Sequence, residues 1–285
     1  MIAHAARTHR VEWALVVAIA AGVWLWVADG AAAQRSWGWP GSARVKIPER
    51  DIFPDNRFTF CRIRYTSYGD RPGYEKWSID YPQSDEHFSW RLSELTTVNV
   101  RRDKDGDYYH VVLDLTDEAL FDYPFIYMLE VGNLVFSEAE VEALRSYLLR
   151  GGFLMVDDFW GEREWANWAM QIARVFDPLE FPMIELPLSH DIFNCVFVLD
   201  EKPQVPNPGT WSHGGNTSEM GEESATPHYK GIHDKNGRMM VIVCHNTDLG
   251  DGWEREGWNE AYFREISAKK AYPMGINIVV YAMTH

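Results

Sequence analysis

Several signatures of common enzyme classes are missing from this sequence. It contains no C-x-x-C pair and no H-E-x-x-H or H-x-x-x-H spacing, the patterns that indicate most zinc sites. It has no G-x-S-x-G or G-x-C-x-G elbow, which disfavours acyl transfer by an elbow nucleophile. The glycine-rich stretch 209–224 follows no clear strand and lacks the lysine of a phosphate-binding loop. We therefore expect no cofactor and no resident metal.

Basic residues are scarce relative to acidic ones. The 27 lysines and arginines face 42 aspartates and glutamates, which gives a formal net charge of −15. A surface with this charge repels the phosphates of nucleic acids and of anionic lipids. We expect no nucleic-acid partner.

Cysteine is also rare, with only Cys61, Cys195 and Cys244 in the chain. An odd number leaves at least one thiol unpaired even where disulfides can form. Cys61 and Cys244 lie inside apolar, strand-like runs, so we expect them to be small buried hydrophobes rather than nucleophiles.

Only one long apolar run occurs, between Trp13 and Val27. Arg7 and Arg10 precede it, and the small residues Ala31 to Ala33 follow it. This order of charge, apolar stretch and small residues is typical of a secretory signal peptide, here residues 1–33 with cleavage before Gln34. The run is shorter than the ~20 residues that a membrane-spanning helix needs, although an uncleaved anchor is the alternative. We expect a periplasmic or secreted protein.

The remainder divides into an N-terminal arm or linker, 34–56, rich in glycine, proline and charge, and a domain over 57–285. Strands are expected at 57–65, 110–115, 124–130, 153–156 and 238–246. The segment 177–236 is expected to be a long irregular insertion, and the stretch 272–283 closes the domain.

Amphipathic helices are expected between these strands, the clearest after Ser137. Ser137 and Glu140 have the spacing of a capping box, and Gly151 supplies a left-handed stop. Further helices are expected over 86–95 and around 165–176. Alternating apolar strands and helices predict an α/β fold with a mainly parallel sheet covered on both faces.

Ligands of such sheets bind outside the carboxyl ends of the strands. Three of the expected strands end in polar residues, and two loops bring further ones. The candidate ligand-binding residues are Glu130, Asp157, Asp158, His245, Asn246 and Asp248 from the strand ends, with Asp80, Asp85 and His190 from the loops.

Three chemistries are open for these residues. Asp157, Asp158, His190 and His245 are ligand types that suit zinc, iron or manganese. One carboxylate paired with Glu130 or His245 across strands could act as a general base. Alternatively, one aspartate caps the following helix and the others form a buried hydrogen-bond network.

The strings DYPQSDEHF, LRSYLLRGGFLMVDDFWG, PLSHDIF and GRMMVIVCHNTDLGDGWE carry a family resemblance. Over residues 57–285 the chain resembles the bacterial domain of unknown function 4159. That family resembles a branch of the class I glutamine amidotransferase-like superfamily, which implies a flavodoxin-like three-layer sandwich. In that superfamily the helix–GG–strand element leads to a nucleophilic cysteine, whereas here the strand ends in Asp157, Asp158 and Phe159. The resemblance therefore implies the fold but not amidotransferase activity.

Taken together, these patterns favour an exported amidotransferase-like domain that binds a polar small molecule or carbohydrate. The abundance of tryptophan, with 13 residues, suits either a sugar platform or a folded core. One alternative is a metal- or carboxylate-dependent hydrolase in the same crevice. Another is a structural partner of a membrane-associated protein assembly.

Overall fold

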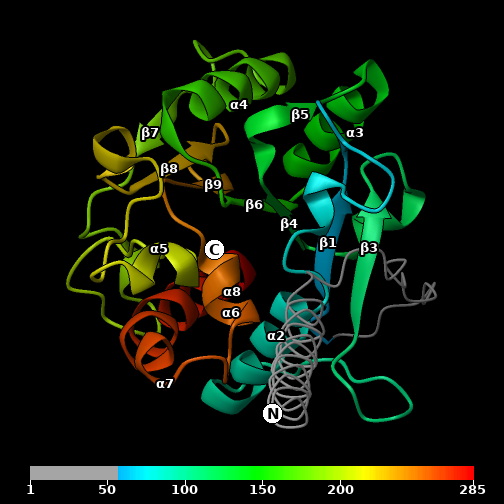
Figure 1. Cartoon of the computed structure of the whole chain (residues 1–285). Helices are drawn as coiled ribbons and strands as arrows, with labels where there is room; N and C mark the ends of the chain where they lie inside the picture. Colours follow the sequence, from blue (N-terminus) through cyan, green and yellow to red (C-terminus); the bar gives the residue numbers. More distant parts are fainter. Residues whose placement is uncertain (1–56) are drawn as a thin grey trace, which may run out of the picture. The chain divides into compact units, whose positions relative to one another are not determined.

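The computed structural model describes residues 57–285, which Figure 1 shows in colour. The predicted signal peptide, 1–33, and the predicted arm, 34–56, lie outside the described residues. Within residues 57–285, no helix has both the length and the apolar character needed to cross a bilayer.

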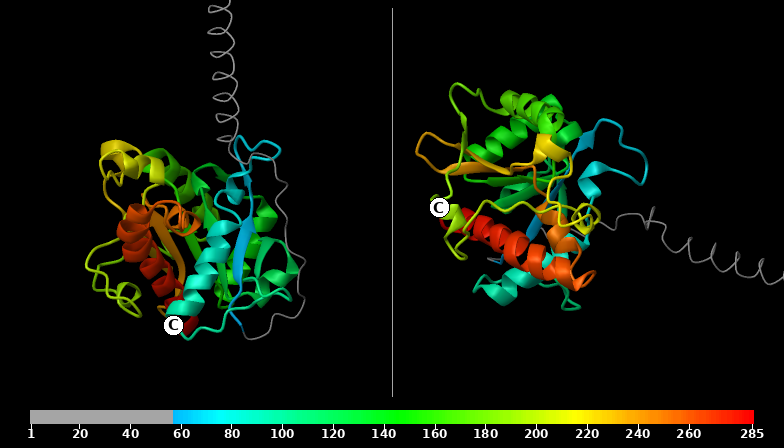
Figure 2. Two further views of the ribbon diagram at one scale, coloured as in Figure 1. Left: turned by 60° about the horizontal axis from the view of Figure 1, so that its bottom comes forward. Right: turned by 60° about the vertical axis from the view of Figure 1, so that its left-hand side comes forward.

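The centre of the domain is a seven-stranded sheet with the order β3-β1-β4-β6-β9-β8-β7 (Figures 1 and 2). Its strands are β1 (Phe60–Arg64), β3 (His110–Asp114), β4 (Phe125–Leu129), β6 (Phe153–Asp157), β7 (Met183–Glu185), β8 (His228–His233) and β9 (Met239–His245). The first five strands in this order are parallel, and β8 and β7 continue the sheet as antiparallel strands. A two-stranded ribbon joins β2 (Thr66–Ser67) to β5 (Leu134–Val135).

This arrangement confirms the predicted α/β class with a mostly parallel sheet. The strands β4, β6 and β9 are parallel members of this one sheet, and the structure shows that they are also neighbours, because β6 pairs with β4 on one side and with β9 on the other. Their unbroken apolar character has a physical cause. All three strands are buried along their whole length, with helices packed against both faces of the sheet.

Two hydrophobic cores lie on opposite faces of the sheet. The helices α2 (Gln83–Leu95), α6 (Leu249–Glu254) and α8 (Tyr272–Thr284) pack on one face with Tyr127 and Met155. The helices α3 (Glu138–Leu149) and α4 (Gly161–Val175) pack on the other face with Met128 and Val156. Neighbouring residues of one strand enter different cores because side chains alternate along a strand. Figure 1 shows the two groups of helices on either side of the sheet.

Shorter elements complete the chain. They are the 3-10 helices Lys76–Ser78, Glu118–Asp122, Val131–Asn133, Asp191–Phe193 and Gly221–Ser224, the short helices α5 (Pro208–Ser212) and α7 (Glu260–Tyr262), and a π-helix over Phe263–Ala271. The π-helix leads directly into α8, so the stretch 272–283 closes the domain as a helix.

The local predictions for α3 are confirmed in detail. The Ser137 side chain accepts a hydrogen bond from the Glu140 backbone, and the Glu140 carboxylate accepts one from the Ser137 backbone. Gly151 follows the helix with a φ of 112°, a conformation that favours glycine. Local sequence chemistry therefore sets both ends of this helix.

The prediction of an irregular insertion over 177–236 is wrong in part. This segment contains β7 and β8, which add two antiparallel strands to the edge of the central sheet. Three of the six residues of β8 are polar and one is Gly231, which hides the strand from pattern recognition. Pairing with β9 holds β8 in place, and sequence periodicity does not report that contact.

Candidate functional site

Four non-glycine residues in the described part of the chain have a positive φ, and all four lie near one edge of the sheet. Glu130, Asp158 and Asn246 directly follow β4, β6 and β9, with φ values of 53°, 50° and 60°. Asp80, with a φ of 61°, lies in the loop that leads into α2. Such conformations cost free energy in non-glycine residues and concentrate where the backbone must present side chains in a set direction.

The side chains of Asp80, Asp158 and Asp248 converge at this edge. Each offers a carboxylate oxygen, and these oxygens lie within 4.8 Å of one another. Asp158 comes from the end of β6, whereas Asp248 is the N-cap of α6 and accepts a hydrogen bond of 2.7 Å from the Asp251 backbone. The Trp160 indole donates to Asp158 at 3.2 Å.

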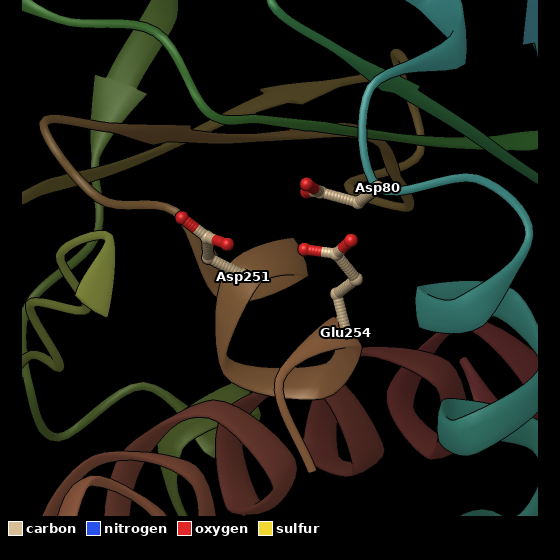
Figure 3. Close-up of side chains that lie close together, drawn as sticks. All are labelled: Asp80, Asp251 and Glu254. Atoms are coloured by element: carbon tan, nitrogen blue, oxygen red, sulfur yellow. The ribbon is translucent and has the colours of Figure 1, made fainter. Parts of the chain in front are cut away.

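A second group shares Asp80 with the first. Asp80, Asp251 and Glu254 also bring carboxylate oxygens within 4.8 Å of one another, and Figure 3 shows the three side chains pointing toward one another. This group includes a basic partner, because the Arg255 Nε atom lies 3.2 Å from the Asp251 carboxylate and 2.7 Å from the Glu254 carboxylate. We call the five residues Asp80, Asp158, Asp248, Asp251 and Glu254 the carboxylate cluster.

Asp157 lies beside this cluster and is fully buried. Its Oδ2 atom accepts hydrogen bonds from the Tyr127 hydroxyl and from the Gly250 backbone, each at 3.1 Å. Its Oδ1 atom is buried without a hydrogen-bond partner, as is the Oδ2 atom of Asp80. A Cβ atom on Gly250 would lie 2.7 Å from Asp80 Oδ2 and 3.0 Å from the Tyr127 hydroxyl. Gly250 therefore lets the helix backbone approach both carboxylates.

Burial and mutual repulsion act on the charges of the cluster. Desolvation raises the pKa of Asp158 well above its usual value, and the carboxylates of Glu130 and Asp80 raise it further. The pKa values of Asp80 and Asp248 are raised well above normal by burial and by neighbouring carboxylates. Burial raises the pKa of Asp157 to about 7 and that of Glu254 to about 7. These groups cannot all be ionised together without a compensating positive charge.

Asp85 belongs to a buried ion pair rather than to the cluster. The Arg62 Nε atom donates to both oxygens of Asp85 at 3.1 Å, and both side chains are completely buried. The same guanidinium donates to the backbone oxygens of Trp77 and Ile79 at 3.0 and 2.9 Å. Arg62 thereby fixes the loop that carries Asp80.

Glu130 lies at the rim of the cluster. Its carboxylate forms an ion pair of 2.8 Å with Lys76, and each side chain is about one-fifth exposed. Burial raises the pKa of Glu130, while Lys76 lowers it in part. Glu130 is near enough to raise the pKa of Asp158, but Lys76 already neutralises it.

His245 and Asn246 face a different space. Side chains alternate along β9, so Cys244 enters the core that contains α6, whereas the His245 ring packs at a tilt against Phe159, with ring centroids 4.8 Å apart. Asn246 accepts a hydrogen bond from the Gly161 backbone and donates one to Thr226. Both residues line a polar pocket of about 200 Å³, together with Glu162, Trp165, Glu222, Glu223, Thr226, His228 and Lys230. Burial lowers the pKa of His245 to about 4, so its ring is neutral at pH 7.

His190 lies away from the carboxyl edge. Its ring packs against Tyr281, with ring centroids 5.5 Å apart. It is also close to His233, whose pKa is lowered by burial and then by His190, and which pairs with Met239 at the start of β9. The structure thus brings Asp158, Asp80 and Asp248 together, with Asp157 and Glu130 beside them. It places His245, Asn246, Asp85 and His190 elsewhere.

Sequence reasoning missed Asp251, Glu254 and Tyr127. A signal for the first two was present, because Asp248, Asp251 and Glu254 are spaced three apart and fall on one side of a helix. Tyr127 gives no such signal, since it reads as one more apolar residue of β4. The expectation that an aspartate after β6 caps the next helix is not met. The N-cap of α4 is Trp160, whose backbone donates to Glu164 at 2.9 Å.

A comparison with family models finds one that matches residues 59–283, described as Domain of unknown function (DUF4159). The match spans most of the chain and nearly all of its described part, so the chain belongs to this family. A comparison with curated proteins gives no match.

Proposed function

We propose that this DUF4159 protein is an exported ligand-binding domain related to the class I glutamine amidotransferases, in which an aspartate replaces the elbow cysteine. One observation carries the proposal. Asp158 stands between β6 and α4 with a φ of 50°, where the superfamily holds its nucleophile, and it converges with Asp80 and Asp248. The ligand would bind at this edge of the sheet, as ligands of parallel sheets do.

The proposed superfamily relation includes a flavodoxin-like three-layer sandwich. The parallel order of β3, β1, β4, β6 and β9, with helices on both faces, supports it. The positive φ of Asp158, between a buried strand and a helix, supports it as well, because a sharp turn of this kind presents one side chain at the carboxyl edge of the sheet.

Thiol chemistry at this edge has no candidate residue among those described. Cys61 and Cys244 are buried within strands, and burial raises the pKa of Cys244 well above its usual value. The Cys195 thiol donates to the Asn277 backbone oxygen at 3.3 Å, against α8. Acyl transfer through a cysteine is therefore not part of the proposal.

The carboxylate cluster determines which ligands could bind at the carboxyl edge of the sheet. Carboxylate oxygens accept hydrogen bonds from hydroxyl and amino groups, so a carbohydrate or another polar small molecule fits this donor-poor site. Trp165 is a poor sugar platform. One of its contacts is the Lys230 ammonium, 4.0 Å from the ring centroid, and another is the near-parallel ring of Phe159. A membrane-associated protein partner that presents basic groups is a further candidate for the same surface.

A second candidate function is hydrolysis by a carboxylate base or a bound metal at the same edge. The observation that favours it is Asp157, whose pKa of about 7 suits a general base near neutral pH. Its Oδ1 atom has no hydrogen-bond partner in the described structure and is available to accept a proton.

A thermal-shift screen of the purified chain against neutral sugars, amino sugars and polyols tests the binding proposal. Asp158→Asn is the informative variant, because asparagine tolerates a positive φ and keeps an oxygen for the Trp160 indole. We expect a ligand that stabilises the wild type to lose at least tenfold in affinity for this variant. Unchanged affinity in Asp158→Asn would place the ligand elsewhere and contradict the proposal.

Export to the periplasm or the medium is the remaining part of the proposal, and it rests on the signal-like segment 1–33. We expect the mature chain to begin at or near Gln34. N-terminal sequencing of protein recovered from the periplasm or medium measures this directly. A chain that still carries residues 13–27 and sediments with membranes would contradict it.

A further inference from the structure

Three carboxylates of the cluster, those of Asp80, Asp158 and Asp248, lack an ion-pair partner in the part of the chain that the structure describes. Arg62 and Arg255 act on Asp80 through space, and Lys76 acts on Asp158 in the same way. All three are already bound to other carboxylates, those of Asp85, of Asp251 and Glu254, and of Glu130. Asp158 is 6 % exposed and Asp248 is 4 % exposed, so bulk water screens their repulsion poorly.

A second observation, independent of this cluster of charges, also indicates a missing ligand. Asp157 is 0 % exposed, and its Oδ1 atom has no hydrogen-bond partner among the described residues. The Oδ2 atom of the same carboxylate bonds to Gly250, which Asp80 Oδ2 and Asp248 Oδ1 also approach. A buried carboxylate oxygen without a donor is costly, and a cation supplies what it lacks.

We propose that Asp80, Asp158 and Asp248 bind a hard divalent cation. The Oδ1 atom of Asp157, beside them, would then contact the cation or a water molecule bound to it. The inference rests on the proposed function, since it gives the carboxyl edge its first ligand. Bound there, the cation would present open coordination positions to the hydroxyl groups of a polar ligand.

The donor chemistry selects the class of ion. All the ligating groups are carboxylates, and no histidine or cysteine of the described chain belongs to either group of candidate ligands. Oxygen-only sites suit Ca²⁺, Mg²⁺ and Mn²⁺, whereas Zn²⁺ and Cu²⁺ favour nitrogen and sulfur. We therefore expect a response to the first three ions and a weaker one to Zn²⁺.

The neighbouring group is the poorer candidate although it shares Asp80. Asp251 and Glu254 already pair with Arg255, and the guanidinium lies where it would repel an ion. Asp80 is the least buried of the three proposed ligands, although its Oδ2 atom is itself buried. A cation held by Asp80 and Asp158 would link the loop before α2 to the end of β6.

Thermal unfolding of the EDTA-treated full chain, titrated with Ca²⁺, Mg²⁺, Mn²⁺ and Zn²⁺, tests the proposal. At an ion concentration about 100 times the Kd, we expect a rise in Tm of about 5–10 °C with a hard ion. In Asp158→Asn we expect the rise to fall by at least half. Without metal, this variant should be at least as stable as the wild type, because one repelling charge has been removed.

Asp191→Asn, which removes an acidic side chain far along the chain from the cluster, is the matched control and should keep the full rise in Tm. If Asp158→Asn fails to fold, Asp248→Asn replaces it, since asparagine caps a helix as well as aspartate does. The absence of any rise with the hard ions would overturn the proposal. So would an equal rise in the wild type and in a folded cluster variant, or a rise with Zn²⁺ alone.

The same titration separates this inference from the proposed function. A sugar or polyol that binds the wild type equally well in EDTA, with no response to cations, would overturn the cation site and leave the proposed ligand site standing. A cation response without any organic ligand would support the cation site and remove the support for the proposed ligand class.

Discussion

At the residue scale, Arg62 holds the backbone next to Asp80 through hydrogen bonds to the carbonyl oxygens of Trp77 and Ile79. It is fully buried in β1, and its guanidinium lies 5.2 Å from the centroid of the Tyr127 ring. Its guanidinium also donates to the Asp85 carboxylate at the start of α2. The two backbone oxygens that it binds lie in the segment just before that helix. Removing Arg62 would leave the Asp85 carboxylate buried without a partner, which is far costlier than losing the same contact at the surface.

We expect Arg62→Met to destabilise the domain by about 3–5 kcal/mol in urea unfolding. The matched control is Arg64→Met on the same strand, whose ion pair with Asp114 is about 40 % exposed on each side. That change should cost about 0–1 kcal/mol, because solvent screens the pair. Equal costs for the two variants would contradict the role given to Arg62.

His245 should make the domain sensitive to acid. Its pKa is about 4 in the folded state and 6.5 in the unfolded chain, because burial disfavours the charged ring. Below pH 6.5 the unfolded chain therefore binds a proton that the folded chain does not bind until about pH 4. From these two values, stability should fall by about 3 kcal/mol as the pH drops across that range.

The measurement is the free energy of unfolding at pH 7 and pH 4 for the wild type and His245→Gln. Glutamine is neutral at both values and can still donate to the Gly161 oxygen that the ring contacts at 3.1 Å. We expect the variant to lose about 3 kcal/mol less than the wild type between the two pH values. The same loss in both proteins would show that His245 titrates normally.

The rule that ligands bind at the carboxyl ends of parallel strands predicted part of the carboxylate cluster, but it also selected residues that the structure places elsewhere. It found Asp158 and Asp248 because both lie at the carboxyl edge of parallel strands. It failed for His245, because residues at the same edge can face opposite sides of the sheet. Which face a strand's last side chain takes depends on register, and the turn at Asp158, with its φ of 50°, changes direction again.

At the scale of elements, α6 reaches its position through close backbone packing against the π-helix. A Cβ atom on Gly252 would lie 2.3 Å from the Cβ of Ala271 and 3.3 Å from a methyl group of Val205. This contact allows α6 to sit deep enough for Asp251 and Glu254 to meet Asp80. Small residues are required on both helices at the crossing.

We therefore expect Gly252→Ala to destabilise the domain by about 1–3 kcal/mol through overpacking. Ala271→Gly alone should cost about 0.5–1 kcal/mol, as glycine does inside a helix. The double variant should be more stable than the sum of the two changes predicts, because the second removes the clash made by the first. Urea unfolding of all four proteins measures the coupling, and strict additivity would contradict the proposed contact.

Elements with a local signal were predictable, and those held by distant contacts were not. The capping box of α3 and the apolar runs of β4, β6 and β9 are written in consecutive residues. In contrast, β8 owes its place to pairing with β9, and β7 owes its place to β8. The α/β class could be predicted from these local signals, whereas the antiparallel edge of the sheet became visible only in the structure.

At the scale of the whole molecule, one edge of the sheet gathers five of the 42 acidic residues that give the chain its formal net charge of −15. Within residues 57–285, Arg255 is the basic residue that forms ion pairs with members of the cluster, and it pairs with Asp251 and Glu254. Acidic composition indicates a surface that avoids nucleic acid, but it does not show where carboxylates converge. That convergence joins residues as far apart as Asp80 and Asp248, and only the fold brings them together.

The most direct test of the cation site is diffraction from crystals of the full chain grown with Mn²⁺. We expect an anomalous difference peak within coordination distance of the carboxylates of Asp80, Asp158 and Asp248. A protein soaked in EDTA provides the reference without metal. A peak elsewhere in the domain, or no peak at a concentration that raises the Tm, would contradict the account.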